Sequence, residues 1–414
     1  MIGRLVFACH RAPVLLDGGA PIRTYKLLMG LSEKFDTTLV TFAYDVGRET
    51  ASLSAAELSE QFSGMPVVVV PGRFGAGGWR KRRSQLLSLA STRSWAFGRY
   101  EVPAFRSALR NVVRRENPAI AHFNDFAVAL SGPVPGTLSV YAAHNVEHRV
   151  QQGAAQTAGG LRRLFGEIEW RRIWREEHRL WKTMDLCLAV SELDANAMDA
   201  GNAHDVEICL VGTDPVPSYG LRPRTRNEPL RILFVGAGSY QPNEQGIAWF
   251  IENVFPNVRD AIPAVFDVVG PPPNRPIRAR GVTYRGYVPS LDSFYRDAHV
   301  AIVPIFFGSG SRGKIVEAMA YGTPVVSSAV GAEGLHVKPD EHYIGADTAE
   351  QFVTALVRLA DRLSAPDGEM ERMLQAARAA AERHFWPNVV SALVETYRSR
   401  IDRSSRARSN ERTP

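Results

Sequence analysis

The sequence has few cysteines, no long apolar run and no targeting pattern at its start. Its three cysteines, Cys9, Cys187 and Cys209, have neither metal-ligand nor disulfide spacing, which favours a reducing compartment. The apolar run Leu5–Cys9 stops at His10, too early for a signal peptide. No stretch approaches the roughly 18 apolar residues of a membrane-spanning helix. These absences predict a cytoplasmic protein.

Composition indicates a folded chain with a basic excess. The 414 residues are 45% hydrophobic and 22% charged, with a formal net charge of +6. This length suits two domains. The positive excess suits anionic ligands such as nucleotides, phosphorylated lipids or a membrane surface, although a GC-rich coding sequence would also enrich arginine. Nothing in the sequence predicts a nucleic-acid partner.

Short β-branched runs alternate with stretches of helical period in two successive series. The first series predicts strands at 5–9, 37–42, 67–70, 120–122, 138–142 and 186–190. The second predicts strands at 231–236, 264–270, 281–285, 299–304 and 323–328. This alternation is typical of βαβ units. We therefore predict an α/β fold with two facing Rossmann-like domains and ligands in the cleft between them.

The domain boundaries follow from where the pattern breaks. We predict an N-terminal domain over 1–212, a linker over 213–229 and a C-terminal domain over 230–385. A last helix is expected at about 386–400, followed by a disordered Arg/Ser tail over 401–414.

The stretch 299–328 carries the strongest signal for a binding site. A buried strand leads into a loop with Gly308 and Gly310, and then into a helix that ends at Gly322. Backbone N–H groups at such a helix start form an anion site. Arg312 and Lys314 add positive charge there, against the usual preference of the helix dipole, as expected if an anion binds.

Lys314 and Glu317 are three residues apart and lie on one face of this predicted helix. A ligand with phosphates at the helix start could place its ribose against the Glu317 carboxylate. The alternative is an ordinary surface ion pair, which contributes little to stability.

Several segments, in order along the chain, resemble GT-B fold glycosyltransferases of family 4. The segments are the glycine turn within 16–42, AHFND at 121–125, YAAHNVEH at 141–148, LAVSELDA at 188–195, YRGYVPSLDSFYRDAHVAIVP at 284–304 and the ending EAMAYGTPVV at 317–326. The pattern GSGSRGKIVEA at 308–318 resembles a bacterial exopolysaccharide-type subset with "GSGxRxKxxEA".

The resemblance implies retaining transfer of a sugar from a nucleotide-diphosphate sugar, without a bound metal or other cofactor. It implies an acceptor-binding N-terminal domain, completed by the last helix crossing back to it, and a C-terminal domain that binds the nucleotide sugar. The implied site residues fall into three groups. They are His144, Arg312 and Lys314 in catalysis; Gly236, Tyr287, Gly308, Ser309, Gly310, Ser311 and Glu317 at the donor; and Gly18, Gly19 and Arg23 at an acceptor or phosphate loop.

The sequence also departs from the family pattern. The family has a second glutamate eight positions before Glu317, where this chain has Ser309. Two basic positions of the second domain are Ala237 and Gln245 here. We predict that Arg312 and Lys314 replace those two charges.

Three features have competing interpretations. A lone histidine after a buried strand is often structural, whereas the resemblance implies that His144 contacts the transferred sugar. Asn243 is interpreted as a helix cap. The stripe Trp170, Trp174 and Trp181 is expected to pack on the core, with contact to an anionic membrane at the inner face as the alternative.

We therefore predict a metal-independent, retaining glycosyltransferase with an unknown acceptor: a glycan, a lipid-linked substrate or a small molecule. The alternatives are a nucleotide-sugar epimerase of the same architecture and an inactive sugar-nucleotide-binding partner subunit.

Overall fold

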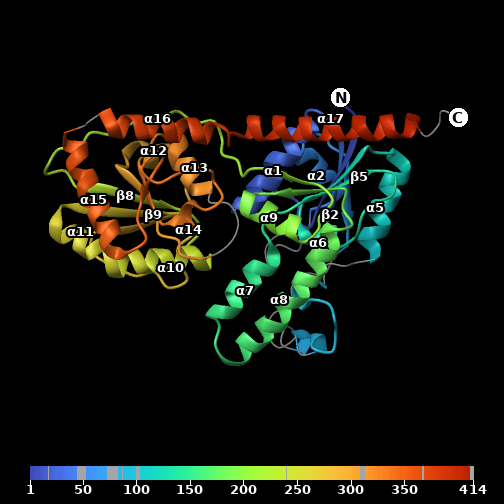
Figure 1. Cartoon of the computed structure of the whole chain (residues 1–414), viewed down its shortest axis with the longest axis horizontal. Helices are drawn as coiled ribbons and strands as arrows, with labels where there is room; N and C mark the ends of the chain where they lie inside the picture. Colours follow the sequence, from blue (N-terminus) through green and yellow to red (C-terminus); the bar gives the residue numbers. More distant parts are fainter. Residues whose placement is uncertain are drawn as a thin grey trace. The chain divides into compact units, whose positions relative to one another are not determined.

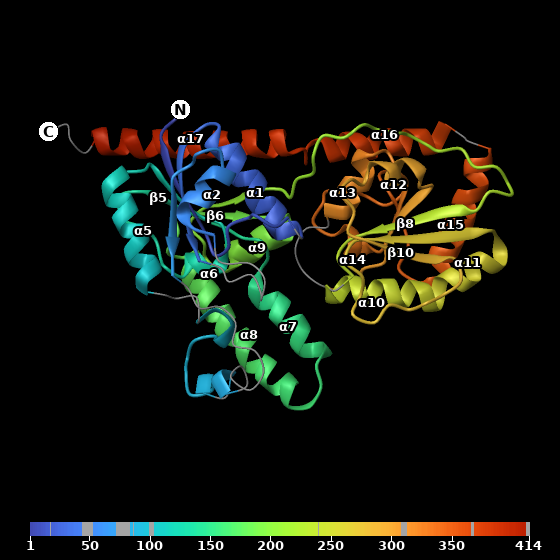
Figure 2. The ribbon, with the colours of Figure 1, turned by 180° about the vertical axis from the view of Figure 1, so that it is seen from behind.

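The computed structural model describes residues 1–16, 18–43, 53–71, 83–85, 87–98, 103–238, 240–307, 313–365 and 368–410. Its internal contacts divide the chain into two units, which are described one at a time. Unit 1 comprises Met1–Leu210 with Val390–Pro414, and unit 2 comprises Val211–Val389. In both, helices flank a central sheet (Figure 1, Figure 2).

The sheet of unit 1 has seven parallel strands in the order β3-β2-β1-β4-β5-β6-β7. The strands are β1 Arg4–Cys9, β2 Asp36–Phe42, β3 Val67–Val70, β4 Ile120–Phe123, β5 Leu138–Ala142, β6 Leu186–Ala189 and β7 Val206–Ile208. All of β1 after Arg4 is buried, as expected for a central strand of a parallel sheet that is covered on both faces.

The helices of unit 1 differ widely in length. They are α1 Gly19–Ser32, α2 Ala55–Gln61, α4 Trp95–Gly98, α5 Pro103–Glu116, α6 Phe126–Ala129, α7 Glu147–Thr157, α8 Gly160–Trp181, α9 Glu192–Ala200 and α17 Trp386–Asn410. Side-chain caps start several of them: Ser54 begins α2 with a capping box, Asp125 begins α6 and Ser191 begins α9.

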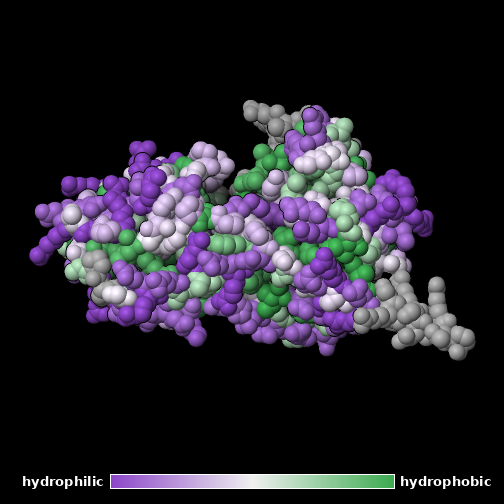
Figure 3. All heavy atoms as spheres, turned by 90° about the horizontal axis from the view of Figure 1, so that it is seen from above, coloured by the Kyte–Doolittle hydropathy of each residue, from purple (hydrophilic) through white to green (hydrophobic). Residues whose placement is uncertain are grey.

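Helix α17 starts in unit 2 and is part of unit 1 from Val390 onward. Its buried residues recur every three or four positions, and its outward ones, such as Glu395 and Arg398, are charged. A Cβ at Gly30 of α1 would lie 2.6 Å from Val390, so the two helices pack closely there. On the side of the molecule that carries α17, hydrophilic residues predominate and hydrophobic ones form small separate patches (Figure 3).

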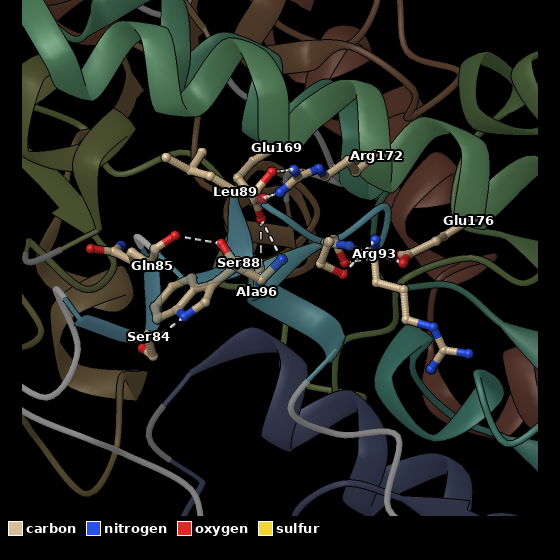
Figure 4. A network of polar contacts seen from close by, with 12 residues as sticks. Ser84, Gln85, Ser88, Leu89, Arg93, Ala96, Glu169, Arg172 and Glu176 are labelled. Atoms are coloured by element: carbon tan, nitrogen blue, oxygen red, sulfur yellow. Dashed lines mark hydrogen bonds and ion pairs between the residues drawn. The ribbon is translucent and has the colours of Figure 1, made fainter.

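Helices α7 and α8 form a hairpin that extends away from the sheet of unit 1 (Figure 1, Figure 2). A buried polar network fastens the residues before α5 to α8 (Figure 4). Glu169 accepts from the backbone N–H of Trp95 at 2.7 Å and pairs with Arg172 at 3.0 Å. Arg172 donates to the carbonyl of Leu89 at 3.2 Å. The network therefore joins Leu89 and Trp95 to the middle of α8.

The sheet of unit 2 has six parallel strands in the order β10-β9-β8-β11-β12-β13. The strands are β8 Leu230–Val235, β9 Ala264–Val269, β10 Val282–Gly286, β11 Val300–Val303, β12 Val325–Ser327 and β13 Ile344–Gly345. The helices are α10 Gln241–Trp249, the π-helix η2 Phe250–Val254, α11 Phe255–Ala261, α12 Asp292–Asp297, α13 Gly313–Ala320, α14 Ala329–Ala332, α15 Ala349–Ser364 and α16 Gly368–Glu382.

The turn after α13 shows why Gly322 stands there. Its φ is +74°, and a Cβ would lie 2.5 Å from the Ser218 hydroxyl and 2.9 Å from the Gly220 nitrogen. The Gly322 N–H donates to Met319 and the Thr323 N–H to Ala318, which closes the helix with a left-handed cap. This turn fixes where α13 ends and therefore its register against β12.

Every strand predicted from the sequence is present, with bounds that differ by at most two residues. The short strands β7 and β13 were not predicted. The segment 213–229, predicted as a linker, lies within unit 2, where Thr213 pairs with Phe385 and Arg224 bonds to Leu363. Helix α17 continues to Asn410, so 401–410 are helical rather than disordered.

Two other predictions are wrong. Asn243 does not cap a helix, because α10 begins at Gln241 and Asn243 lies in its first turn. The tryptophans of α8 do not form one core stripe: Trp181 is fully buried, whereas Trp174 is 42% exposed and Trp170 lies beneath the Arg171 guanidinium. Among the described helices, none combines the length and the apolar character needed to cross a bilayer.

Candidate functional site

Lys314 lies at the carboxyl end of β8, the edge where ligands bind in open α/β sheets. It is the second residue of α13, and its ammonium donates to Asn243 Oδ1 at 3.1 Å. The same nitrogen lies 5.6 Å from the centre of the Phe234 ring, in cation–π contact. Asn243 in turn donates to the carbonyl of Ala237 at 2.8 Å. Helix α13, the first turn of α10 and the end of β8 thus converge on one cation.

Gly236 gives this cation access to the strand end. Its φ is +151°, and a Cβ added there would lie 3.1 Å from Asn243 Nδ2 and 3.4 Å from Lys314 Cε. Across the neighbouring strand end, a Cβ at Gly270 would lie 2.3 Å from the Gly236 carbonyl oxygen. Gly236 therefore lies beside Lys314, and its missing side chain leaves room at the ammonium.

Glu317 lies one turn further along α13 and is half-buried. Its Oε2 accepts a hydrogen bond from the Tyr295 hydroxyl at 3.0 Å. Burial raises the pKa of the Glu317 carboxyl to about 7, and Asp214 acts in the same direction, while Tyr295 and Lys314 act against it. A carboxyl held in this way carries a full charge only above neutral pH.

The structure says less about the other residues that the sequence predicts at the donor. Tyr287 is 73% exposed in the turn after β10, and no contact in the described residues joins it to Lys314 or Glu317. Gly308, Ser309, Gly310, Ser311 and Arg312 lie outside the described residues, so the structure places neither the glycine loop nor the second predicted cation.

The second polar cluster lies in unit 1 at the carboxyl ends of β1, β4 and β5. His144 follows β5, and its Nε2 lies 3.2 Å from the Asn124 amide. Burial and the nearby charge of Arg23 lower the pKa of His144 to about 3. The imidazole is therefore neutral, available for hydrogen bonding rather than as a charge.

Arg23 is bonded to backbone carbonyls of unit 1. It lies inside α1 and is 2% exposed, and its guanidinium donates to the carbonyls of Ala143 at 3.1 Å and Cys209 at 3.3 Å. Its Nε has no hydrogen-bond partner within the part of the chain that the structure describes. Arg23 therefore ties β5 and β7 to α1 and supplies a fixed positive charge beneath His144.

Gly18 and Gly19 form the start of α1. Gly18 is the N-cap, in extended conformation, and Gly19 is the first helical residue. Among the described residues, apart from chain neighbours and the helix backbone, no atom lies within 4 Å of a Cβ built at either position. Open space above a helix N-terminus is compatible with an approaching ligand.

His10 and Asp125 form a pair that local sequence does not predict. The Asp125 carboxylate accepts from the His10 backbone N–H at 2.8 Å, and the same oxygen lies 3.0 Å from His10 Nδ1. Burial disfavours the charged form of each group, but the attraction and hydrogen bonds between the two groups favour it more. The pKa of His10 is therefore raised and that of Asp125 is lowered. His10 follows β1 directly and Asp125 follows β4 closely. Their shared place at the carboxyl ends of two strands is the sequence feature that could have predicted the pair.

A buried carboxylate also supports the start of α7. Glu177 of α8 accepts from the backbone N–H groups of Glu147 and His148, each at 2.8 Å, and from His148 Nδ1 at 2.6 Å. Burial, and then the charges of Glu177 and Asp125, raise the pKa of Glu147 to about 8. The cluster therefore holds a carboxyl group that is mostly protonated at neutral pH. No group of three or more His, Cys, Asp or Glu side chains in the described ranges is arranged to hold a metal ion.

Known proteins resemble this chain in part of its sequence and in its fold. Residues 229–362, which contain Lys314 and Glu317, match the family described as "Glycosyl transferases group 1". A stretch of 108 residues is 36% identical to D-inositol 3-phosphate glycosyltransferase of Xylanimonas cellulosilytica, covering 26% of this chain and 25% of that protein. The enzyme of that name from Streptomyces griseus is 35% identical over 124 residues, again 25% of its length. The chain thus matches about a quarter of these curated relatives.

Solved structures share the fold over nearly the whole chain. Sucrose-phosphate synthase from Thermosynechococcus elongatus has a TM-score of 0.67 at 15% identity, covering 96% of this chain and 98% of that one. HepE from Anabaena, solved with UDP-glucose, has a TM-score of 0.61 at 14% identity, covering 96% and 100%. The predicted α/β class with two Rossmann-like sheets is confirmed, and its neighbours are GT-B glycosyltransferases. The family match covers residues 229–362 and therefore lies within unit 2.

Proposed function

We propose that this protein is a glycosyltransferase that moves a sugar from a nucleotide-diphosphate sugar to an acceptor hydroxyl, with retention at the anomeric carbon and without a metal. The observation that carries the proposal is the placement of Lys314 and Glu317 on one face of α13, within the matched domain. The cation lies beside Gly236 at the end of β8, and the carboxyl lies one turn away.

The roles follow from this geometry. The Lys314 ammonium would contact the diphosphate and stabilise the negative charge that develops on it as the sugar departs. Arg312, outside the described residues, would share this role. Glu317 would accept hydrogen bonds from the ribose hydroxyls, and the neutral His144 would contact the transferred sugar.

The donor class is supported by the neighbours. HepE was solved with UDP and glucose and also with UDP-glucose, and UDP-linked sugars are therefore the first donors to test. The acceptor class (glycan, lipid-linked substrate or small molecule) is left open by the fold.

Donor turnover tests the proposal against its alternatives. Purified protein is incubated with UDP-glucose, UDP-galactose and GDP-mannose, with and without mixed acceptors, and the nucleotide and sugar products are quantified. A glycosyltransferase requires the acceptor for transfer. An epimerase isomerises or hydrolyses the donor without one. A protein that binds UDP in a thermal-shift assay but turns over none of these donors is the inactive subunit that Ser309 would allow.

We also propose peripheral contact with an anionic membrane, at a different place from the tryptophan stripe. Leu161 and Leu164, one turn apart at the start of α8, are 85% and 60% exposed. Arg162 and Arg163 beside them are exposed too, a combination typical of interfacial helices. The double variant L161S/L164S should lose co-sedimentation with phosphatidylglycerol vesicles, whereas L193S, at a 42% exposed leucine of α9, should keep it. Equal sedimentation of the wild type and both variants would contradict the membrane contact.

A further inference from the structure

The carboxyl group of Glu317 is held by a tyrosine from another helix. Tyr295 lies in α12, 22 residues earlier in the chain, and donates its hydroxyl hydrogen to Glu317 Oε2 at 3.0 Å. Tyr295 is 2% exposed. A buried hydroxyl that bonds to a half-buried carboxylate is well placed to fix the orientation of that carboxylate.

The Tyr295 ring is itself fixed by stacking. It lies parallel to the Tyr321 ring, with centroids 4.5 Å apart and an interplanar angle of 15°. Tyr321 stacks on Tyr219 at 5.9 Å and 9°. The Tyr321 hydroxyl donates to Asp292 Oδ1 at 2.7 Å, and Asp292 is the first residue of α12. The Tyr295 hydroxyl therefore has little freedom to leave Glu317.

We propose that Tyr295 is a positioning residue of the donor site: it occupies Oε2 of Glu317 and so presents Oε1 to the ribose hydroxyls of a nucleoside diphosphate. The proposal rests on the proposed function, because Glu317 needs a ribose to hold. Tyr295 acts through Glu317 and has no assigned contact with the sugar.

The titratable and charged groups around Glu317 set the expected pH dependence. They come from three elements: Tyr295 from α12, Asp214 from the segment before β8, and Lys314 from α13 itself. Burial and Asp214 raise the pKa of Glu317, to about 7, and Tyr295 and Lys314 lower it. Removal of the Tyr295 hydroxyl therefore raises this pKa further. Because the ionised carboxylate is the stronger acceptor, nucleotide affinity should fall as the pH drops through the pKa of Glu317.

The test measures UDP affinity by calorimetry between pH 6 and pH 9 for the wild type, Y295F and a matched control, Y284F. Y284F also removes one hydrogen-bonded tyrosine hydroxyl. That hydroxyl donates to the carbonyl of Ile277 at 3.2 Å and not to Glu317. We expect Y295F to bind UDP about tenfold more weakly at pH 7, as for loss of a hydrogen bond to a charged group. Its affinity midpoint should move to higher pH, while Y284F keeps the wild-type curve.

A second variant covers the case in which Y295F does not fold. E317D keeps the charge but draws the carboxylate back by one methylene group, so it cannot reach both Tyr295 and the ribose. We expect E317D to weaken UDP binding nearly as much as E317Q. Wild-type affinity in E317D, to within twofold, would overturn the proposal.

The outcomes also separate this inference from the proposed function. If the wild type binds UDP and E317Q weakens binding while Y295F leaves both affinity and midpoint unchanged, Tyr295 is not a positioning residue and the donor site stands. If the wild type binds no UDP at millimolar concentration, the UDP donor site fails and the positioning role fails with it.

Discussion

Replacing Lys314 with methionine should separate phosphate binding from nucleoside binding. The substitution keeps most of the length of the side chain but removes its charge, its hydrogen bond to Asn243 and its cation–π contact with Phe234. A hydrogen bond between an ammonium and a phosphate oxygen contributes about 1.5–3 kcal/mol, which is about 10–150-fold in Kd. We therefore expect K314M to bind UDP at least tenfold more weakly and to bind uridine within about twofold of the wild type.

The stability of K314M should fall by a moderate amount. The lost bond to Asn243 contributes about 1.5–3 kcal/mol and the ring contact up to about 1 kcal/mol. For a unit of this size, 1 kcal/mol lowers the melting temperature by about 2–4 °C. The melting temperature should therefore fall by no more than about 16 °C, and binding can be measured on folded protein at 25 °C.

The assay is titration calorimetry with UDP and with uridine, at low and at moderate salt. A charge-matched control is K338M, because Lys338 is 75% exposed and pairs only weakly with Glu341 at 3.4 Å. K338M should bind both ligands as the wild type does. Equal loss of UDP and uridine affinity in K314M would contradict the phosphate contact, since that pattern indicates general damage to the nucleotide site. Wild-type affinity of K314M for UDP would contradict it as well.

Three further predictions concern charge, metal and stereochemistry. Because the pKa of Glu147 is raised to about 8, its contribution to stability is full at acid pH and is lost as the pH rises from about 4.5 through 8. The melting temperature of E147Q relative to that of the wild type should accordingly rise between pH 6 and pH 9. A constant difference between the two melting temperatures over this range would contradict the raised pKa of Glu147. Transfer should survive EDTA; complete loss that manganese or magnesium restores would show that a metal neutralises the diphosphate. NMR of the first product formed should show retention at the anomeric carbon, and clean inversion would remove the family 4 assignment.

The sequence predicted the sheets well because each strand is a short apolar run with clear borders. The runs 67–70 and 138–142 match β3 and β5 residue for residue. The strands β7 and β13 were not predicted because both are short and only partly buried, so they contain no clear apolar run. Helix α17 extends past Arg400 with a polar composition that a sequence-based reading takes for a disordered tail.

The candidate site was only half predictable. Lys314, Glu317 and His144 stand in motifs of local sequence, whereas their partners do not. Asn243 precedes Lys314 by 71 residues, and local chemistry made it resemble a cap. His10 and Asp125 are 115 residues apart and meet only because β1 and β4 are neighbours in the sheet. Pairings of this kind depend on strand order, which periodicity does not determine.

The path of α17 has a consequence for synthesis on the ribosome. Tyr397 bonds to His122 Nδ1 at 2.6 Å, and Arg400 bonds to Asp205 and Glu207, each at 2.8 Å. Unit 1 is therefore started first but finished last, since these residues emerge only after all of unit 2 has been translated. Unit 2 can close its core while the chain is still growing, and the polar cluster around His122 and Asn124 must wait. A nascent chain stalled before residue 390 would expose the parts of α1 and β4 that α17 contacts, and is the species that chaperones would be expected to hold.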